Sequence, residues 1–278
     1  MSSALDCAGK PVDLSRPRVM GILNVTPDSF SDGGRFIGAT AALEHALAMV
    51  EAGADFIDIG GESTRPGAEP VSAEVEIGRV VPVIEALGPH CPVPISIDTS
   101  KPAVMRAAVA AGAGLINDVR ALREPGAVET AVELGVPVCL MHMQGEPRTM
   151  QAAPAYKDVV AEVRDFLLGR AAACEAAGMP REGILLDPGF GFGKALAHNL
   201  SLLRHLDVLI ATGYPVLVGL SRKSMLGQLT GLPVEQRLAP SLAAAVLAAR
   251  AGARVIRVHD VGETVAALAL VAAMMEAD

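Results

Sequence analysis

Polar and charged side chains recur in this sequence directly after short apolar runs. They comprise carboxylates, amides, hydroxyls and cations: Asn24, Glu62, Asp98, Asn117, His142, Asp187, Ser221, Arg222, Lys223, Arg257 and His259. Asp98, Asn117 and Asp187 together offer two carboxylates and an amide, which suit a flat heterocycle with adjacent N–H donors. Buried polar groups need hydrogen-bond partners, so these would need one another, water or a ligand. We therefore expect a small-molecule site where they meet.

Cations accompany these acceptors. Arg257 and His259 are two residues apart in an apolar run, so their side chains should point to the same side of a strand. Asp58 lies inside another apolar run, and we expect it to pair with a cation in the interior of the fold, with Arg257 as the candidate. The pattern predicts one cationic position beside the acceptors.

Two glycine-rich segments follow apolar runs. They are NVTPDSFSDGG at 24–34 and GGESTRPG at 60–67, and both combine hydroxyls with glycines. Such loops can bind phosphate through backbone N–H groups. They can also be ordinary mobile connections, although loops at the ends of strands often carry function.

The elements that must position these residues alternate in type. The apolar runs that predict strands are 19–23, 56–59, 95–98, 115–117, 138–142, 184–187, 216–220 and 255–259. The segments rich in Ala, Leu, Glu and Arg that predict helices are 39–52, 72–87, 102–111, 125–134, 156–177, 197–207, 236–251 and 262–276. Runs that are apolar on both faces are typical of buried parallel strands. This alternation predicts a parallel sheet with right-handed crossovers.

Eight strand–helix units predict an α/β protein with a closed (β/α)8 TIM barrel, and an open doubly wound sheet is the alternative. The 278 residues suit one such barrel, which needs about 250 residues. Residues 5–14 are expected to form a short β-hairpin at the amino end of the barrel, and residues 1–278 a single domain. In a barrel the polar residues at the strand ends share one rim, where barrel enzymes build their sites.

Composition narrows the class of protein. The net charge of −8, the 3% aromatic content and the lack of Trp argue against a nucleic-acid surface. The apolar stretch 265–275 is too short for a membrane span, which needs about 20 residues. Four cysteines without a CxxC pair indicate reduced thiols, and we expect a cytoplasmic enzyme without membrane contact.

Several motifs resemble the dihydropteroate synthases, pterin-binding enzymes of folate biosynthesis with a TIM barrel. The motifs are NVTPDSFSDGG at 24–34, GGESTRPG at 60–67, DTS at 98–100, ND at 117–118, DPGFGFGK at 187–194, GLSRKSM at 219–225 and IRVHD at 256–260. The resemblance runs from about residue 5 to residue 270. One departure is Ala239-Pro240-Ser241, where the family commonly has a glycine before the hydroxyl residue. Proline is tolerated in a first helical turn, so we expect this to change only the helix start.

The resemblance implies a role for individual residues. The pterin would be bound by Asp98, Asn117, Asp187, Lys223, Arg257 and Phe192. The diphosphate would be bound by Thr64, Arg65, Arg257 and His259. The 4-aminobenzoate would lie against Phe30, Pro66 and Ser224. Asn24 would contact a Mg²⁺ ion held mainly by diphosphate oxygens.

The resemblance also implies the reaction. A pterin methyl diphosphate would lose diphosphate in an SN1-like step and be attacked by the amine of 4-aminobenzoate, with Lys223, Arg257 and Asp187 as the catalytic residues. No nucleophile of the protein is needed, and the chain shows no Ser–His–Asp or Cys–His signature. The alternatives are a non-catalytic pterin-binding paralogue and a pterin-dependent methyltransferase domain. The family further implies a homodimer, to which the Ala-, Val- and Leu-rich segments 236–251 and 262–276 would contribute.

Overall fold

Eight parallel strands form the centre of the molecule. The computed structural model describes residues 4–26, 35–63, 67–146 and 148–276, so Phe30, Thr64, Arg65 and Pro66 lie outside the described residues. The strands are β3 (Arg18–Asn24), β4 (Phe56–Gly60), β5 (Ile95–Asp98), β6 (Leu115–Asp118), β7 (Val138–Met141), β8 (Ile184–Asp187), β9 (Leu217–Val218) and β10 (Val255–Val258). Their order is β8-β7-β6-β5-β4-β3-β10-β9, and a parallel bridge between Leu186 and Val216 joins β8 to β9. The predicted barrel is therefore confirmed, and the open-sheet alternative is wrong.

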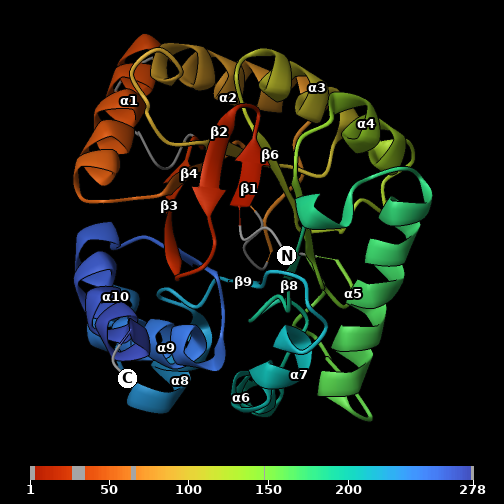
Figure 1. The fold of residues 1–278 in the computed structure, drawn as a ribbon, viewed down its shortest axis with the longest axis vertical. Helices are drawn as coiled ribbons and strands as arrows, with labels where there is room; N and C mark the ends of the chain where they lie inside the picture. Colours follow the sequence, from red (N-terminus) through yellow and green to blue (C-terminus); the bar gives the residue numbers. More distant parts are fainter. Residues whose placement is uncertain (1–3, 27–34, 64–66, 147, 277–278) are drawn as a thin grey trace.

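Helices surround this ring on the outside (Figure 1). They are α1 (Arg35–Glu51), α2 (Ala73–Leu87), α3 (Pro102–Ala110), α4 (Ala127–Leu134), α5 (Val159–Ala176), α6 (Leu196–Arg204), α7 (Leu206–Ile210), α8 (Ser224–Thr230), α9 (Leu238–Ala251) and α10 (Val261–Glu276). Their ends follow local chemistry. The Ser72 hydroxyl accepts a hydrogen bond from Val75 N, Pro102 occupies the first turn of α3, and Gly252 ends α9 in the left-handed conformation.

Two segments differ from the predicted elements. The expected strand 216–220 is reduced to Leu217–Val218, because the chain then turns into the loop that carries Ser221 and Lys223. The expected helix 197–207 is two helices that meet at His205, whose φ of −112° and ψ of 34° are not helical. Pro240 lies in the first turn of α9 and leaves that helix intact, as expected.

The amino end of the barrel is closed by apolar side chains. The antiparallel hairpin of β1 (Ala4–Cys7) and β2 (Lys10–Asp13) confirms the prediction for residues 5–14 and lies across the ring of strands (Figure 1). The hairpin and the barrel strands together form a buried cluster, which consists of Leu5, Cys7, Val12, Leu14, Met20, Phe56, Leu115, Cys139, Leu185, Leu217 and Val255. Layers of inward side chains fill TIM barrels in this way. We call these residues the apolar layer.

One step of two residues toward the carboxyl end changes this chemistry. Phe56, Leu115, Leu185 and Val255 belong to the apolar layer, whereas Asp58, Asn117, Asp187 and Arg257 follow them on the same strands. Residues two apart on a strand face the same side, so these polar groups also point into the barrel. With Asp98 and Lys223, they form what we call the polar layer.

Candidate active site

Arg257 is the centre of the polar layer. Its Nε atom donates to Asp58 Oδ2 at 2.6 Å, and its Nη2 atom donates to Asp98 Oδ2 at 2.9 Å. Asn117 Nδ2 donates to the same Asp58 oxygen at 3.1 Å. The structure therefore brings together three predicted site residues, and the expected pairing of Asp58 with Arg257 is confirmed.

Burial dominates the electrostatics of this cluster. It raises the pKa of Asp98 to about 7, although the Arg257 guanidinium favours the ionised carboxylate. Burial also opposes the charge of Arg257, but Asp58 and Asp98 outweigh it and raise the pKa of that guanidinium. Asp58 is fully buried, and within the described residues its Oδ1 atom has no hydrogen-bond partner. The group thus holds more acceptor capacity than it uses.

Lys223 and Asp187 form the second half of the layer. Lys223 Nζ donates to the carbonyl of Phe190 and lies 4.2 Å from the centre of the Phe192 ring. Burial lowers the pKa of Lys223 to about 8, although the Asp187 carboxylate favours its ammonium form. Burial raises the pKa of Asp187, opposed by a hydrogen bond from Gly189 N to Oδ1 at 2.7 Å and by Lys223. Acceptors and a cation thus face one another beside an aromatic ring.

The loop between β8 and α6 supports this half of the site. Lys194 is buried, and its Nζ atom lies within 3.0 Å of the Gly189 and Phe192 carbonyls and of His142 Nδ1. Gly189 is left-handed, and a Cβ atom there would lie 1.9 Å from the His142 carbonyl oxygen. Lys194 therefore holds the loop that presents Phe192. This lysine ends the motif DPGFGFGK at 187–194, and the sequence pattern predicted no role for it.

His259 lies in the loop after β10, and Ser224 is the first residue of α8. Ser221 Oγ accepts a hydrogen bond from His259 N at 3.2 Å and lies 3.0 Å from His259 Nδ1. Lys223 precedes α8, which begins at Ser224, and the Ser224 side chain is exposed. The hydrogen bond between Ser221 and His259 thus links the loop that holds the histidine predicted to bind diphosphate to the segment that leads to Ser224, the serine predicted to bind 4-aminobenzoate.

Asn24 ends β3 and pairs in register with Gly60 at the end of β4. A Cβ atom at Gly60 would lie 3.9 Å from Asn24 Oδ1 and 3.8 Å from Asp98 Oδ2, so both oxygens face the space that the glycine leaves. Among the described residues, no group of three or more His, Cys, Asp or Glu side chains could hold a metal. A single amide oxygen fits Mg²⁺, which keeps waters and takes phosphate oxygens as ligands.

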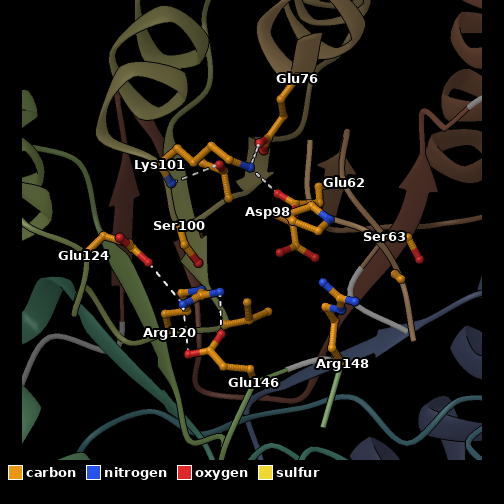
Figure 2. Close-up of a pocket in the computed structure, with 14 residues that line it drawn as sticks. Glu62, Ser63, Glu76, Asp98, Ser100, Lys101, Arg120, Glu124, Glu146 and Arg148 are labelled. Carbon is orange, nitrogen blue, oxygen red and sulfur yellow. Dashed lines mark hydrogen bonds and ion pairs between the residues drawn. The ribbon is translucent and has the colours of Figure 1, made fainter. Parts of the chain in front are cut away.

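A cavity of about 320 Å³ opens beside Asp98, between the loops that follow β4, β5, β6 and β7. Figure 2 shows Lys101 reaching from the loop after β5 toward Glu62 and Glu76. Glu76 is fully buried near the start of α2 although Glu is rarely buried, so Lys101 joins the second glycine-rich segment, at Glu62, to the helix that follows it. This contact was not predicted, because nothing in the spacing of the apolar residues of α2 indicates that Glu76 is buried.

Sequence comparison identifies relatives over almost the whole chain. A family described as "Pterin binding enzyme" matches residues 20–259. Dihydropteroate synthase of Escherichia coli (strain K12) is 57% identical over 269 residues, which cover 97% of this chain and 95% of that protein.

Solved structures agree with that match. Dihydropteroate synthase of Xanthomonas albilineans with 4-aminobenzoic acid has a TM-score of 0.95 and 56% identity, with 100% of both chains covered. A structure of the Xanthomonas albilineans enzyme with 7,8-dihydropteroate has a TM-score of 0.90 and 54% identity, and covers 99% of this chain and 100% of that one. Within the part of the chain that the structure describes, no helix is long and apolar enough to cross a membrane. Since both the identity and the barrel with its polar layer extend along the chain, it belongs to the dihydropteroate synthase family of transferases.

Proposed function

We propose that this chain condenses 6-hydroxymethyl-7,8-dihydropterin diphosphate with 4-aminobenzoate, and so releases diphosphate and forms 7,8-dihydropteroate. The observation that carries the proposal is the polar layer, in which Asp98, Asn117, Asp187, Lys223 and Arg257 converge inside one end of the barrel. Relatives with more than half of their residues identical have been solved with 4-aminobenzoic acid and with 7,8-dihydropteroate.

The pterin would form hydrogen bonds with acceptors and donors of the polar layer that are not fully used within the protein. Asp187 would accept the 2-amino and N3–H donors, since a carboxylate accepts two parallel donors. Lys223 would turn from the Phe190 carbonyl to the ring carbonyl and N5, with Phe192 beside it. Asn117 and Asp98 would complete the pterin edge, while Arg257 would stack on the ring and face the diphosphate.

The leaving group needs positive charge at the rim. His259 and Arg257 would supply it from β10 and its following loop, together with Thr64 and Arg65. Asn24 would hold a Mg²⁺ ion with diphosphate oxygens, and that ion would neutralise charge on the leaving diphosphate. The bond from the pterin methylene carbon to the diphosphate oxygen breaks, and its electron pair leaves with the diphosphate.

The arylamine completes the substitution. Its nitrogen attacks the methylene carbon, which the electron-rich pterin ring stabilises as a cation, and the nitrogen then loses a proton to solvent. Phe30 and Pro66 would enclose the ring of 4-aminobenzoate, and Ser224 at the start of α8 would bind its carboxylate. The step is SN1-like because the carbon–oxygen bond breaks before the carbon–nitrogen bond forms.

A homodimer is part of the proposal. Exposed apolar side chains on α9 and α10 support it, with Leu247 55% exposed and Leu270 74% exposed. Exposed apolar side chains of this size favour association when a partner can bury them. Light scattering should give about twice 28.6 kDa, and a mass of one chain at all concentrations would contradict the dimer. A cytoplasmic location is also proposed, since all four cysteines are buried free thiols.

A turnover assay tests the function directly. Purified chain should convert pterin diphosphate and 4-aminobenzoate to dihydropteroate when Mg²⁺ is present, and Arg257→Ala should serve as the depleted control. Tight pterin binding without product would identify a non-catalytic paralogue instead. Methyl transfer to or from a reduced pterin would identify the methyltransferase alternative.

A further inference from the structure

Arg222 has an unusual backbone for its residue type. Its φ is 56°, the left-handed region that favours glycine, yet it stands between Ser221 and Lys223 in the loop after β9. A non-glycine residue persists there only when its surroundings hold it. The turn sends three successive side chains to different partners, since Ser221 contacts His259, Arg222 contacts Asp260 and Lys223 contacts Phe190.

Hydrogen bonds hold both the backbone and the guanidinium of Arg222. Its N–H donates to Ser241 Oγ at 2.9 Å, and its carbonyl accepts from Arg237 Nη1 at 3.1 Å. Its guanidinium makes two hydrogen bonds to Asp260, from Nε to Oδ2 at 3.0 Å and from Nη2 to Oδ1. The residue thus connects the loop after β9, the start of α9 and the loop after β10.

The start of α9 is itself fixed against α8. Arg237 Nε donates to the Leu232 carbonyl at 3.0 Å, and Ser241 Oγ donates to the Arg237 carbonyl at 2.5 Å. A Cβ atom at Gly227 would lie 2.3 Å from the Arg237 guanidinium, so a larger residue at this position of α8 would displace that side chain. The two residues that bond to the Arg222 backbone, Arg237 and Ser241, are therefore themselves hydrogen-bonded to their surroundings.

Two links then join the loops after β9 and β10. The inner link is the pair Ser221 and His259, and the outer link is the pair Arg222 and Asp260. Asp260 directly follows His259, and Arg222 directly precedes Lys223. The separation of Lys223 from His259 therefore depends on the outer pair as well as on the inner one.

We propose that Arg222 and Asp260 are a positioning pair that keeps the pterin lysine Lys223 and the diphosphate histidine His259 in register. The inference rests on the proposed function, because the roles of Lys223 and His259 come from it. Bond breaking needs the pterin carbon and the leaving diphosphate to be held together, and a displacement of about 1 Å can cost about 100-fold in rate. The Arg222 side chain is 38% exposed, so the pair should contribute much less to stability than to turnover.

Glycine and alanine variants separate the ion pair from the backbone strain. Arg222→Gly removes the ion pair but keeps a residue that tolerates the positive φ, whereas Arg222→Ala removes the pair and keeps the strain. We expect kcat to fall about 10- to 100-fold in Arg222→Gly and in Asp260→Ala. The Kd for pterin without diphosphate should change less than about threefold, because the acids of the polar layer are intact. Arg222→Ala should have the lower Tm of the two Arg222 variants.

A double-mutant cycle shows whether the two residues act together. The double variant Arg222→Gly with Asp260→Ala should be no slower than either single variant, because each change already breaks the same pair. Asp260→Asn keeps the shape of the side chain and should therefore lose less activity than Asp260→Ala. If Arg222→Gly does not fold, the comparison of these two Asp260 variants tests the proposal instead. Arg106→Ala breaks an exposed ion pair with Glu133 on the outer helices and should keep wild-type kcat.

The outcomes distinguish this proposal from the proposed function. Wild-type kcat in Arg222→Gly and Asp260→Ala, with only a lower Tm, would show that the pair is structural and would overturn the positioning role. A loss of pterin affinity as large as the loss of kcat would overturn it too, since the pair would then shape the pterin pocket. Absence of dihydropteroate from the wild-type chain would overturn both proposals together.

Discussion

The two layers inside the barrel differ in chemistry although the same strands build them. The apolar layer at the amino end packs Phe56, Leu115, Leu185 and Val255 under the hairpin. The polar layer, two residues further along, holds Asp58, Asn117, Asp187 and Arg257. Because residues two apart on a strand face the same side, the side chains of both layers point into the barrel. Only the residue types therefore make one layer a packed apolar core and the other a binding site.

The layers also differ in what completes them. Apolar side chains gain by burial against one another and need no ligand, at about 25 cal/mol per Å² removed from water. Buried charges must be paired, and Asp58 Oδ1 lacks a partner among the described residues. The amino end therefore serves stability, while the carboxyl end keeps binding capacity for a substrate, a trade-off common in enzymes.

Phe56→Ala tests the division between the layers and should have the largest effect. Removing a fully buried aromatic ring should lower the free energy of unfolding by about 3–5 kcal/mol. Chemical denaturation measures this loss, and calorimetry on the folded protein should find near-normal pterin affinity. A loss of pterin affinity comparable to the loss of stability would mean that the two layers are coupled.

Arg257→Ala tests the polar layer at its centre. It should lower kcat by about 100- to 1,000-fold, since the charge that stabilises the leaving diphosphate is removed. It should also weaken pterin binding, because Asp58 and Asp98 lose their cation. Steady-state kinetics and calorimetry measure both effects, and a change in KM with unaltered kcat would contradict the role in turnover.

Asp187→Asn tests the pterin edge without removing volume. One acceptor oxygen becomes a donor facing ring N–H groups, so pterin affinity should fall by about 2–4 kcal/mol. Isothermal titration with a pterin ligand measures this difference, with Asp6→Asn on the exposed part of the hairpin as the matched control. Near-normal affinity of Asp187→Asn would show that the edge is assigned to the wrong residue.

The order in which ligands bind tests whether the 4-aminobenzoate site at the rim forms only when diphosphate is bound, unlike the two buried layers. We expect 4-aminobenzoate to bind about 5- to 150-fold more tightly once diphosphate and Mg²⁺ are present, which is typical of coupling between two ligands. The physical reason is that diphosphate would favour closure of segments 24–38 and 60–71 over the site. These segments contain the two glycine-rich motifs, with Phe30 and Pro66. Titrations with and without Mg²⁺-diphosphate decide this, and equal affinities would indicate a preformed arylamine pocket.

The pH dependence should report Lys223 and has the smallest expected effect. Burial lowers the pKa of this lysine to about 8, so the free enzyme loses the ammonium form as the pH rises past that value. The value of kcat/KM for the pterin diphosphate should then fall about tenfold per pH unit above that pKa, and it should also fall toward acid pH as Asp98, whose pKa is raised to about 7, is protonated. A pH–rate profile measures this, and a flat profile to pH 10 would show that the charge of Lys223 is not needed.

The sequence by itself determined the barrel and most of the rim. Apolar runs of three to five residues alternating with helical segments predict β3 to β10, and the residue that ends each run predicts Asp98, Asn117 and Asp187 at one edge. These features are local, because the spacing of apolar residues that indicates a strand or a helix can be seen within one short stretch of sequence. The roles of Phe30, Thr64, Arg65 and Pro66 lie outside the described residues and stay predictions.

Only the tertiary structure decided which groups meet. Lys101 reaches Glu76 across 25 positions and Arg222 reaches Asp260 across 38, and no local pattern indicates either pair. The left-handed turn at Arg222 could not be expected from an arginine, since its sequence favours an ordinary backbone. Side-chain pairing depends on how the closed ring of strands brings its loops together, and that closure is a property of the whole chain.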